Sequence, residues 1–156
     1  MTKEVAQCQC GQLQIVCANN YLMHGQCSCE DCQRRTGTPT SFHLYYKAKD
    51  VEIKGEFKTF TRKAEEGREI EFIFCPECGG SLAFDIPWAD DVYGEKMTGI
   101  PLGNFTNPKI AAPDVSVWNC YLPTWFPNVV TETRRMAEQP KTIDDIKLVL
   151  RSLGKL

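Results

Sequence analysis

Short runs of alternating apolar and polar residues predict strands along much of the chain. In residues 4–17, Leu13 and Ile15 alternate with glutamines, which predicts a strand or a hairpin. Further strands are expected within residues 42–61, 69–74, 81–86, 115–118 and 119–121, with 81–86 returning from 69–74. Frequent Gly and Pro between these runs favour an antiparallel, mainly β protein.

The C-terminal segment follows a helical period instead. Thr142 and Asp145, three residues later, resemble a capping box. Apolar residues then recur at helical spacing up to a glycine that can end the helix: Ile143, Ile146, Val149, Leu150, Leu153 and Gly154. We expect one amphipathic helix over about 142–153 that covers the end of a sheet. Because no linker, low-complexity tract or repeat interrupts the chain, residues 1–156 are predicted to form one domain.

Composition narrows the class of protein. Of the 156 residues, 42% are apolar and 24% charged, which is usual for a globular domain. The formal net charge of -2 gives no electrostatic reason to expect nucleic acid as a partner, and the apolar runs are too short to span a membrane. The polar N-terminal residues do not resemble a secretion signal, so we expect a cytoplasmic protein in a reducing compartment.

That expectation decides how the nine cysteines are interpreted. Their number is odd, and a chain of this length does not need disulfides to be stable. In a reducing compartment, clustered cysteines more often bind metal. Zinc is the first candidate, because soft thiolates favour it and it has no redox chemistry.

The first candidate metal site combines two cysteine pairs, Cys8-Gln9-Cys10-Gly11 and Cys75-Pro76-Glu77-Cys78-Gly79-Gly80. Two residues between cysteines curl the chain so that both sulfurs face one ion, and cysteines two apart on a strand share a face. We expect Cys8, Cys10, Cys75 and Cys78 to form a closed, structural four-thiolate zinc site. The alternative is two unrelated pairs of buried thiols.

A second cluster lies between those pairs and consists of Cys27, Cys29 and Cys32. Three protein ligands and an open position are the arrangement in which zinc performs chemistry, since the ion can lower the pKa of a bound thiol or water and polarise a carbonyl. Arg34 and Arg35 follow directly. They are expected to offset the charge of three thiolates and to attract a carboxylate-bearing ligand.

Two alternatives for this trio stay open. A fourth protein ligand would make it a second structural site, and the candidates are Cys17, Cys120, His24, His43, Glu30 and Asp31. A redox group that cycles through a disulfide is the other alternative. Cys17 and Cys120 are otherwise expected to be small buried residues, and the two histidines are isolated. The aromatic run 118–126 is expected to pack in the core or in a surface groove, with a pocket lining as the alternative.

The order of these motifs resembles the glutathione-dependent formaldehyde-activating enzyme (GFA) family. The order is C-x-C-G, then C-x-C-x-x-C followed by R-x-T-G, then F-C-P-x-C-G-G-S, and the resemblance covers about residues 5–126. It implies a β-tent fold, a structural zinc on the four-cysteine set and a catalytic zinc on the trio. It also implies an activity that joins the thiol of glutathione to formaldehyde, giving S-hydroxymethylglutathione; in reverse this is a carbon–sulfur lyase.

The chain departs from the family pattern around the trio and late in the sequence. Gln26 and Ser28 stand where a histidine is usual, Ser116 and Leu122 replace a histidine and a lysine, and residues 102–108 lack an acidic pair. The resemblance therefore supports the family's metal sites in this chain more strongly than it supports the family's substrate. We expect a zinc-dependent enzyme acting on a small thiol adduct, with glutathione and formaldehyde as the default pair. The alternative is a zinc-stabilised module that binds a thiol ligand or a protein without turnover.

Overall fold

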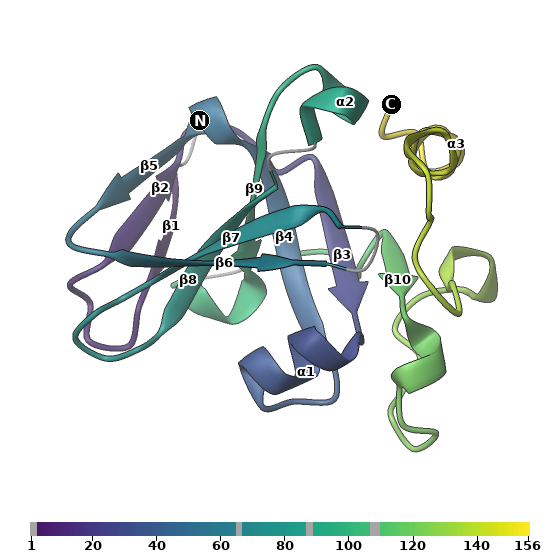
Figure 1. Cartoon of the computed structure of the whole chain (residues 1–156), viewed down its shortest axis with the longest axis horizontal. Helices are drawn as coiled ribbons and strands as arrows, with labels where there is room; N and C mark the ends of the chain where they lie inside the picture. The colour runs from purple at the N-terminus through teal and green to yellow at the C-terminus, as the bar shows by residue number, and fades with distance from the viewer. Residues whose placement is uncertain (1–2, 65–66, 87–88, 107–109) are drawn as a thin grey trace. The chain divides into compact units, whose positions relative to one another are not determined.

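The structure is a computed structural model that describes residues 3–64, 67–86, 89–106 and 110–156 (Figure 1). Most of its elements are strands, arranged in two sheets, which confirms the mainly β prediction. The chain forms two compact units, one from residues 1–22 and 44–108 and the other from 23–43 and 109–156. A single domain over 1–156 stays a prediction. None of the helices among the described residues has the length and apolar character needed to cross a membrane.

The first unit contains a three-stranded antiparallel sheet. Strands β1 (Glu4–Gln7) and β2 (Gln14–Cys17) form a hairpin in which Ala6 lies opposite Ile15, and β5 (Val51–Lys54) pairs with the other side of β2. Of the strand or hairpin predicted over 4–17, the structure shows the hairpin. Cys17 is buried, as predicted.

The other strands of this unit follow the order β4, β9, β8, β7, β6. Their bounds are β4 (Ser41–Lys47), β6 (Lys58–Lys63), β7 (Glu69–Phe74), β8 (Ser81–Ile86) and β9 (Met97–Pro101). The pairs β6–β7, β7–β8 and β8–β9 are antiparallel, which confirms 81–86 as the return strand of 69–74. Only the part of β4 from Leu44 onward belongs to this unit. Short helices connect the strands: η1 (Ala48–Asp50), α2 (Asp90–Tyr93) and η3 (Leu102–Asn104).

An aromatic cluster around Phe84 forms part of the core of the first unit. The Phe84 ring lies 5.7 Å from the Phe72 ring and 6.0 Å, edge-on, from the Tyr45 ring. Gly99 lies opposite Phe84 in the β8–β9 pair, and a Cβ built on it would lie 2.3 Å from the Phe84 ring. The cluster therefore requires a residue without a side chain at position 99.

The second unit is built on β3 (Met23–Cys27), which pairs with the start of β4 and with β10 (Val115–Val117). The β3–β10 pair is parallel, an exception to the antiparallel arrangement that we expected. Helix α1 (Glu30–Thr36) follows β3 directly. The remaining elements of this unit are η4 (Asn119–Tyr121), η5 (Glu132–Arg134) and α3 (Ile143–Ser152).

The prediction of a strand at 119–121 is wrong. Trp118 adopts a left-handed conformation with a φ of 60°, which ends the extended chain, and the 3₁₀ helix η4 follows. The Asn119 side-chain amide holds this turn by donating to the backbone oxygens of Ser116 (2.9 Å) and Met136 (2.8 Å). Cys120 lies on η4 and is exposed, so its predicted burial is also wrong.

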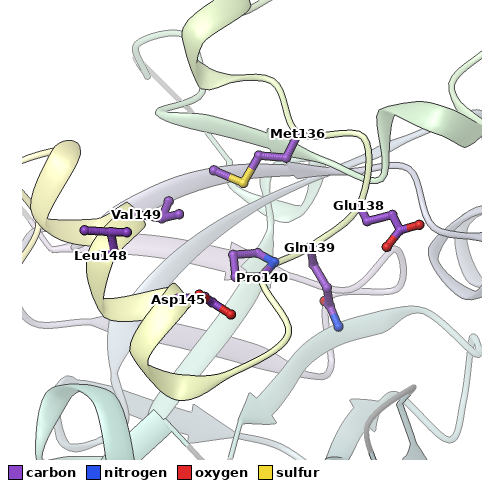
Figure 2. Close-up of a pocket in the computed structure, with 7 residues that line it drawn as sticks. All are labelled: Met136, Glu138, Gln139, Pro140, Asp145, Leu148 and Val149. Carbon is purple, nitrogen blue, oxygen red and sulfur yellow. The ribbon is translucent and has the colours of Figure 1, made fainter.

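The predicted C-terminal helix is confirmed as α3. The Asp145 backbone N–H donates to Thr142 Oγ1 (3.1 Å), and the Asp145 carboxylate accepts from the Thr142 backbone N–H, which completes the capping box. The helix ends at Ser152, and Gly154 follows its C-cap with a φ of 67°, so that the Lys155 N–H donates to the Leu150 oxygen. A shallow groove of about 300 Å³ separates α3 from the segment before it (Figure 2). It is lined by Met136, Glu138, Gln139, Pro140, Asp145, Leu148 and Val149.

Candidate metal centres

The four-cysteine cluster forms where two turns of the first unit meet. Cys8 and Cys10 lie in the turn between β1 and β2, and Cys75 and Cys78 lie in the turn between β7 and β8. Their sulfurs all lie within 4.8 Å of one another, with 3.5 Å between Cys8 and Cys10 and 3.7 Å between Cys10 and Cys75. Tetrahedral zinc with Zn–S bonds of about 2.3 Å separates its sulfurs by roughly 3.8 Å. The geometry and the soft donors therefore fit zinc.

Local backbone structure places the second pair of these sulfurs. The Cys75 N–H donates to the Gly80 oxygen and the Gly79 N–H donates to the Cys75 oxygen, both at 3.0 Å. Gly79 has a φ of 71°, a conformation that side chains disfavour, so the glycine after Cys78 is needed for the turn. The C-P-x-C-G-G motif therefore folds as its sequence indicates.

Hydrogen bonds to the sulfurs of this cluster favour the thiolate form at Cys75. Gln12 Nε2 donates to Cys75 Sγ (3.1 Å) and the Leu13 N–H donates to Cys8 Sγ (3.3 Å). Burial raises the pKa of the Cys75 thiol, but the hydrogen bonds from Gln12 and from the backbone N–H groups of Cys78 and Glu77 outweigh it and lower the pKa to about 6. Cys75 thus offers a thiolate at neutral pH, as a metal ligand must.

The three-cysteine cluster lies at the junction of β3 and α1 in the second unit. Cys27 ends β3, Cys29 is the N-cap of α1, and Cys32 lies in the first turn of that helix. Their sulfurs lie within 4.8 Å of one another, and all three residues are only partly buried. Cys29 Sγ accepts a hydrogen bond from the Cys32 N–H (3.4 Å). Three soft donors that converge and are still reachable fit a zinc ion with one position left for a ligand.

Because the three thiols lie close together, their pKa values shift in different directions. Hydrogen bonds with Cys27 and Cys29 lower the pKa of the Cys32 thiol, and His43 and Ser41 add to this effect against the opposing effect of burial. The pKa of Cys27 is raised well above its usual value, first by its hydrogen bonds to the other two thiols and then by burial. In the metal-free cluster these contacts favour the thiolate at Cys32 and the neutral thiol at Cys27.

No fourth protein ligand joins the trio in the part of the chain that the structure describes. No other Cys, His, Asp or Glu atom there lies within 4.8 Å of all three sulfurs. Glu30 and Asp31 instead make long ion pairs with Arg34, at 3.5 and 3.7 Å. His24 Nδ1 hydrogen-bonds to the Ala111 oxygen (3.0 Å). These contacts give no support to a closed second structural site.

The second buried histidine is bound to an arginine. Arg35 Nη2 lies 2.9 Å from His43 Nε2, and because a guanidinium can only donate, this nitrogen accepts the hydrogen bond and the imidazole is neutral. Burial lowers the pKa of His43 to about 4; the Cys32 thiolate opposes this, while Arg35 and His24 add to it. This pairing could not be predicted from the sequence, because the two residues are eight positions apart and on different elements.

The sequence matches the family model described as glutathione-dependent formaldehyde-activating enzyme (GFA) over residues 3–121. The chain belongs to this family. Both cysteine clusters of this GFA protein lie inside the matched region. A comparison with curated proteins finds no match. A crystal structure of a Rhodobacter sphaeroides protein is 15% identical to this chain, with a TM-score of 0.48, over 67% of this chain and 90% of that one.

Several polar residues around the trio of this GFA protein were not singled out by sequence reasoning as site residues. Ser28, Gln33, Thr40 and Ser41 all hydrogen-bond to the backbone or to one another beside the three cysteines. No spacing rule identifies such residues, because their contacts depend on how β4 packs beside β3. Only the proximity of Ser28 and Gln33 to the cysteines in the sequence pointed to this region.

Proposed function

We propose that this GFA-family protein is a zinc-dependent enzyme that makes and breaks the carbon–sulfur bond of a small thiol adduct. Glutathione and formaldehyde are the default substrates, with S-hydroxymethylglutathione as their product. The observation that carries the proposal is the partly exposed trio of Cys27, Cys29 and Cys32, with no fourth ligand among the described residues, in a chain of this family.

The two clusters take different roles in the proposal. Cys8, Cys10, Cys75 and Cys78 hold a structural zinc, and the trio holds a second zinc whose remaining position faces substrate. Zinc bound there would supply Lewis acidity, which lowers the pKa of a thiol and polarises a carbonyl. In the forward reaction the thiol sulfur bonds to the carbonyl carbon and the thiol proton ends on the carbonyl oxygen. The reverse reaction breaks the same bond and returns the proton to sulfur.

The arginines after the trio are proposed to bind the carboxylates of the thiol substrate. The Arg34 side chain is 69% exposed, and its ion pairs with Glu30 and Asp31 are long. Exposed ion pairs contribute little free energy, so a substrate carboxylate can replace them. Arg35 differs because His43 fixes one edge of its guanidinium. We therefore assign Arg34 to capture of the carboxylate and Arg35 to its orientation.

One further observation bears on the cellular location, and another on the choice between an enzyme and a binding module. All nine cysteines are free, as metal-binding thiolates require, and we propose a cytoplasmic location on that basis. A binding module without turnover would be favoured by a closed trio, which the contacts of Glu30, Asp31 and His24 do not support.

The proposal is tested by the rate at which zinc-loaded protein forms the adduct of glutathione with formaldehyde. Zinc content is measured first, with two ions per chain expected. The loaded protein should accelerate the reaction above the buffer rate. Cys29→Ser should abolish the acceleration, because it removes a ligand of the second metal. Cys120→Ser is the matched control, since this exposed thiol belongs to neither cluster and its loss should leave the rate unchanged.

A rate equal to that of buffer, with both metals present, would exclude this pair of substrates. Tight binding of glutathione without any acceleration would instead favour the binding module. Reversible loss of free thiols on mild oxidation of metal-loaded protein would favour a redox role for the trio.

A further inference from the structure

Every backbone and side-chain polar group of Ser28, the residue between Cys27 and Cys29, is hydrogen-bonded. Ser28 is fully buried. Its N–H donates to the Val117 oxygen (3.2 Å), and its oxygen accepts from Gln33 Nε2 (2.9 Å). Its hydroxyl donates to Thr40 Oγ1 (2.9 Å). This short stretch of chain is therefore fixed from three directions by protein groups alone.

The neighbouring carbonyl group of Cys27 is held in the same way. Its oxygen accepts from Thr40 Oγ1 and from Ser41 Oγ, both at 3.2 Å. The Thr40 and Ser41 residues are each only 5% exposed, so these bonds are shielded from water. The Ser28 hydroxyl donates to Thr40 and the Thr40 hydroxyl donates to Cys27, so each proton in the chain of bonds has one acceptor.

Gln33 extends this network to the other side of α1. Its Nε2 also donates to the Tyr121 oxygen (3.1 Å), which ties the helix that carries Cys32 to η4. The side chains of Ser28, Gln33, Thr40 and Ser41, which we call the collar, therefore fix the backbone of Cys27 and Ser28 and tie it to α1.

We propose that the collar holds the three sulfurs in their metal-binding arrangement before any metal arrives, and that its four residues are positioning residues for the affinity of this centre. The inference rests on the proposed function, in which the trio binds metal. A site that is already ordered does not lose conformational entropy when the ion binds, so its affinity is higher. Removing one hydrogen-bonding partner also leaves a buried polar group unsatisfied, which loosens the cluster.

The test is the affinity of the full chain for its second metal ion. Protein with one zinc in the four-cysteine cluster is titrated with Co²⁺ against a chelator, and the thiolate-to-cobalt absorption reports occupancy of the trio. Thr40→Val keeps the shape of the side chain and removes the hydroxyl. The variant should lower the affinity of the trio for its metal ion by about 10- to 100-fold and leave the affinity of the four-cysteine cluster unchanged.

Thr98→Val is the matched control. Thr98 is 3% exposed and its hydroxyl donates to Asp85 Oδ1 (2.7 Å), so the variant also loses a buried hydroxyl, but in the other unit. Its affinity for the second metal should equal that of the wild type. If Thr40→Val does not fold, Ser28→Ala and Gln33→Leu make the same test. Ser28→Ala removes the bond to Thr40, and Gln33→Leu removes the bonds to the Ser28 and Tyr121 oxygens.

A second measurement follows the Ser28 N–H in protein that lacks the second metal. The collar predicts slow hydrogen exchange of this amide without the ion and faster exchange in Thr40→Val. Wild-type affinity in all three variants, or rapid exchange in the wild type until metal is added, would overturn the collar. A wild-type chain that takes up only one metal would instead overturn the proposed function and the collar with it.

Discussion

The side-chain amide of Gln12 donates a hydrogen bond of 3.1 Å to the sulfur of Cys75. The same nitrogen donates to the Glu56 oxygen (2.7 Å), and Gln12 Oε1 accepts from the Glu56 N–H (3.1 Å). One side chain thus connects the turn before β2, the turn before β6 and the four-cysteine cluster. Gly55 allows this approach, because a Cβ on it would lie 2.1 Å from the Gln12 backbone oxygen.

Gln12→Leu should therefore weaken both the first metal centre and the fold of its unit. The variant removes a hydrogen bond to a thiolate and two to the backbone, and a loss of about 1–3 kcal/mol in unfolding free energy is expected. Chelator competition and chemical denaturation measure the two effects. Gln14→Leu is the control, since the Gln14 side chain donates to the Gly11 oxygen (3.3 Å) and, among the described residues, to no sulfur. Equal zinc retention in the two variants would show that Gln12 does not act on the sulfur.

Gly99→Ala should destabilise the first unit by overpacking. The added methyl group would meet the Phe84 ring at 2.3 Å, and that ring is buried between Phe72 and Tyr45. We expect a loss of about 1–3 kcal/mol, or roughly 2–12 °C in melting temperature for a chain of this size. Gly103→Ala is the matched control, because a Cβ there meets nothing within 4 Å. Equal melting temperatures for Gly99→Ala and Gly103→Ala would contradict the packing around Phe84.

Parts of the fold could be predicted because local residues determine them. The β1–β2 hairpin and the β7–β8 return follow from period-two alternation, and the capping box of α3 follows from Thr142 and Asp145. The strands β3 and β9 did not show this alternation. In β3 the polar residues His24 and Gln26 are buried, and β9 contains Gly99 and ends in proline.

The site could be predicted only as far as cysteine spacing determines it. Spacing indicated which sulfurs converge, and the structure brings each group within 4.8 Å. It did not indicate α1, which has seven residues and no buried side chain and therefore lacks an apolar stripe. Nor did it indicate the turn at Trp118, because a left-handed tryptophan has no local signal. The collar and the Arg35–His43 pair depend on contacts between elements, which spacing does not encode.

Loss of one ligand should affect the two metal centres differently. Cys75→Ser should lower both zinc content and melting temperature, because Cys75 is fully buried and its cluster joins two turns of the first unit. Cys29→Ser should remove one zinc with little change in melting temperature, because the collar holds the trio without metal. Elemental analysis and calorimetry on the same samples measure both effects. A similar drop in melting temperature for the two variants would contradict different roles for the two centres.

The buried His43 should make the unfolding free energy depend on pH. Its pKa of about 4 in the folded protein lies below the usual 6.5, chiefly because it is buried, with Arg35 and His24 adding to the effect and Cys32 opposing it. Above pH 6.5 both states are neutral at this residue and it contributes no pH dependence. As the pH falls below 6.5, His43 is protonated in the unfolded chain but stays neutral in the folded chain. The unfolding free energy therefore falls by about 1.4 kcal/mol per pH unit until the pKa of the folded state is reached.

His43→Gln removes this contribution and keeps a polar side chain that can accept from Arg35. Denaturation from about pH 7 to about pH 5 should show the wild type losing about 2 kcal/mol more than the variant. Titrating groups that do not interact with His43 cancel in the difference, which therefore reports His43 together with its coupling to Cys32 and His24. Parallel stability curves would contradict a neutral His43. A titration of its ring by NMR, with a midpoint near 6.5, would do so independently, because an imidazole that protonates so readily cannot be buried against a guanidinium.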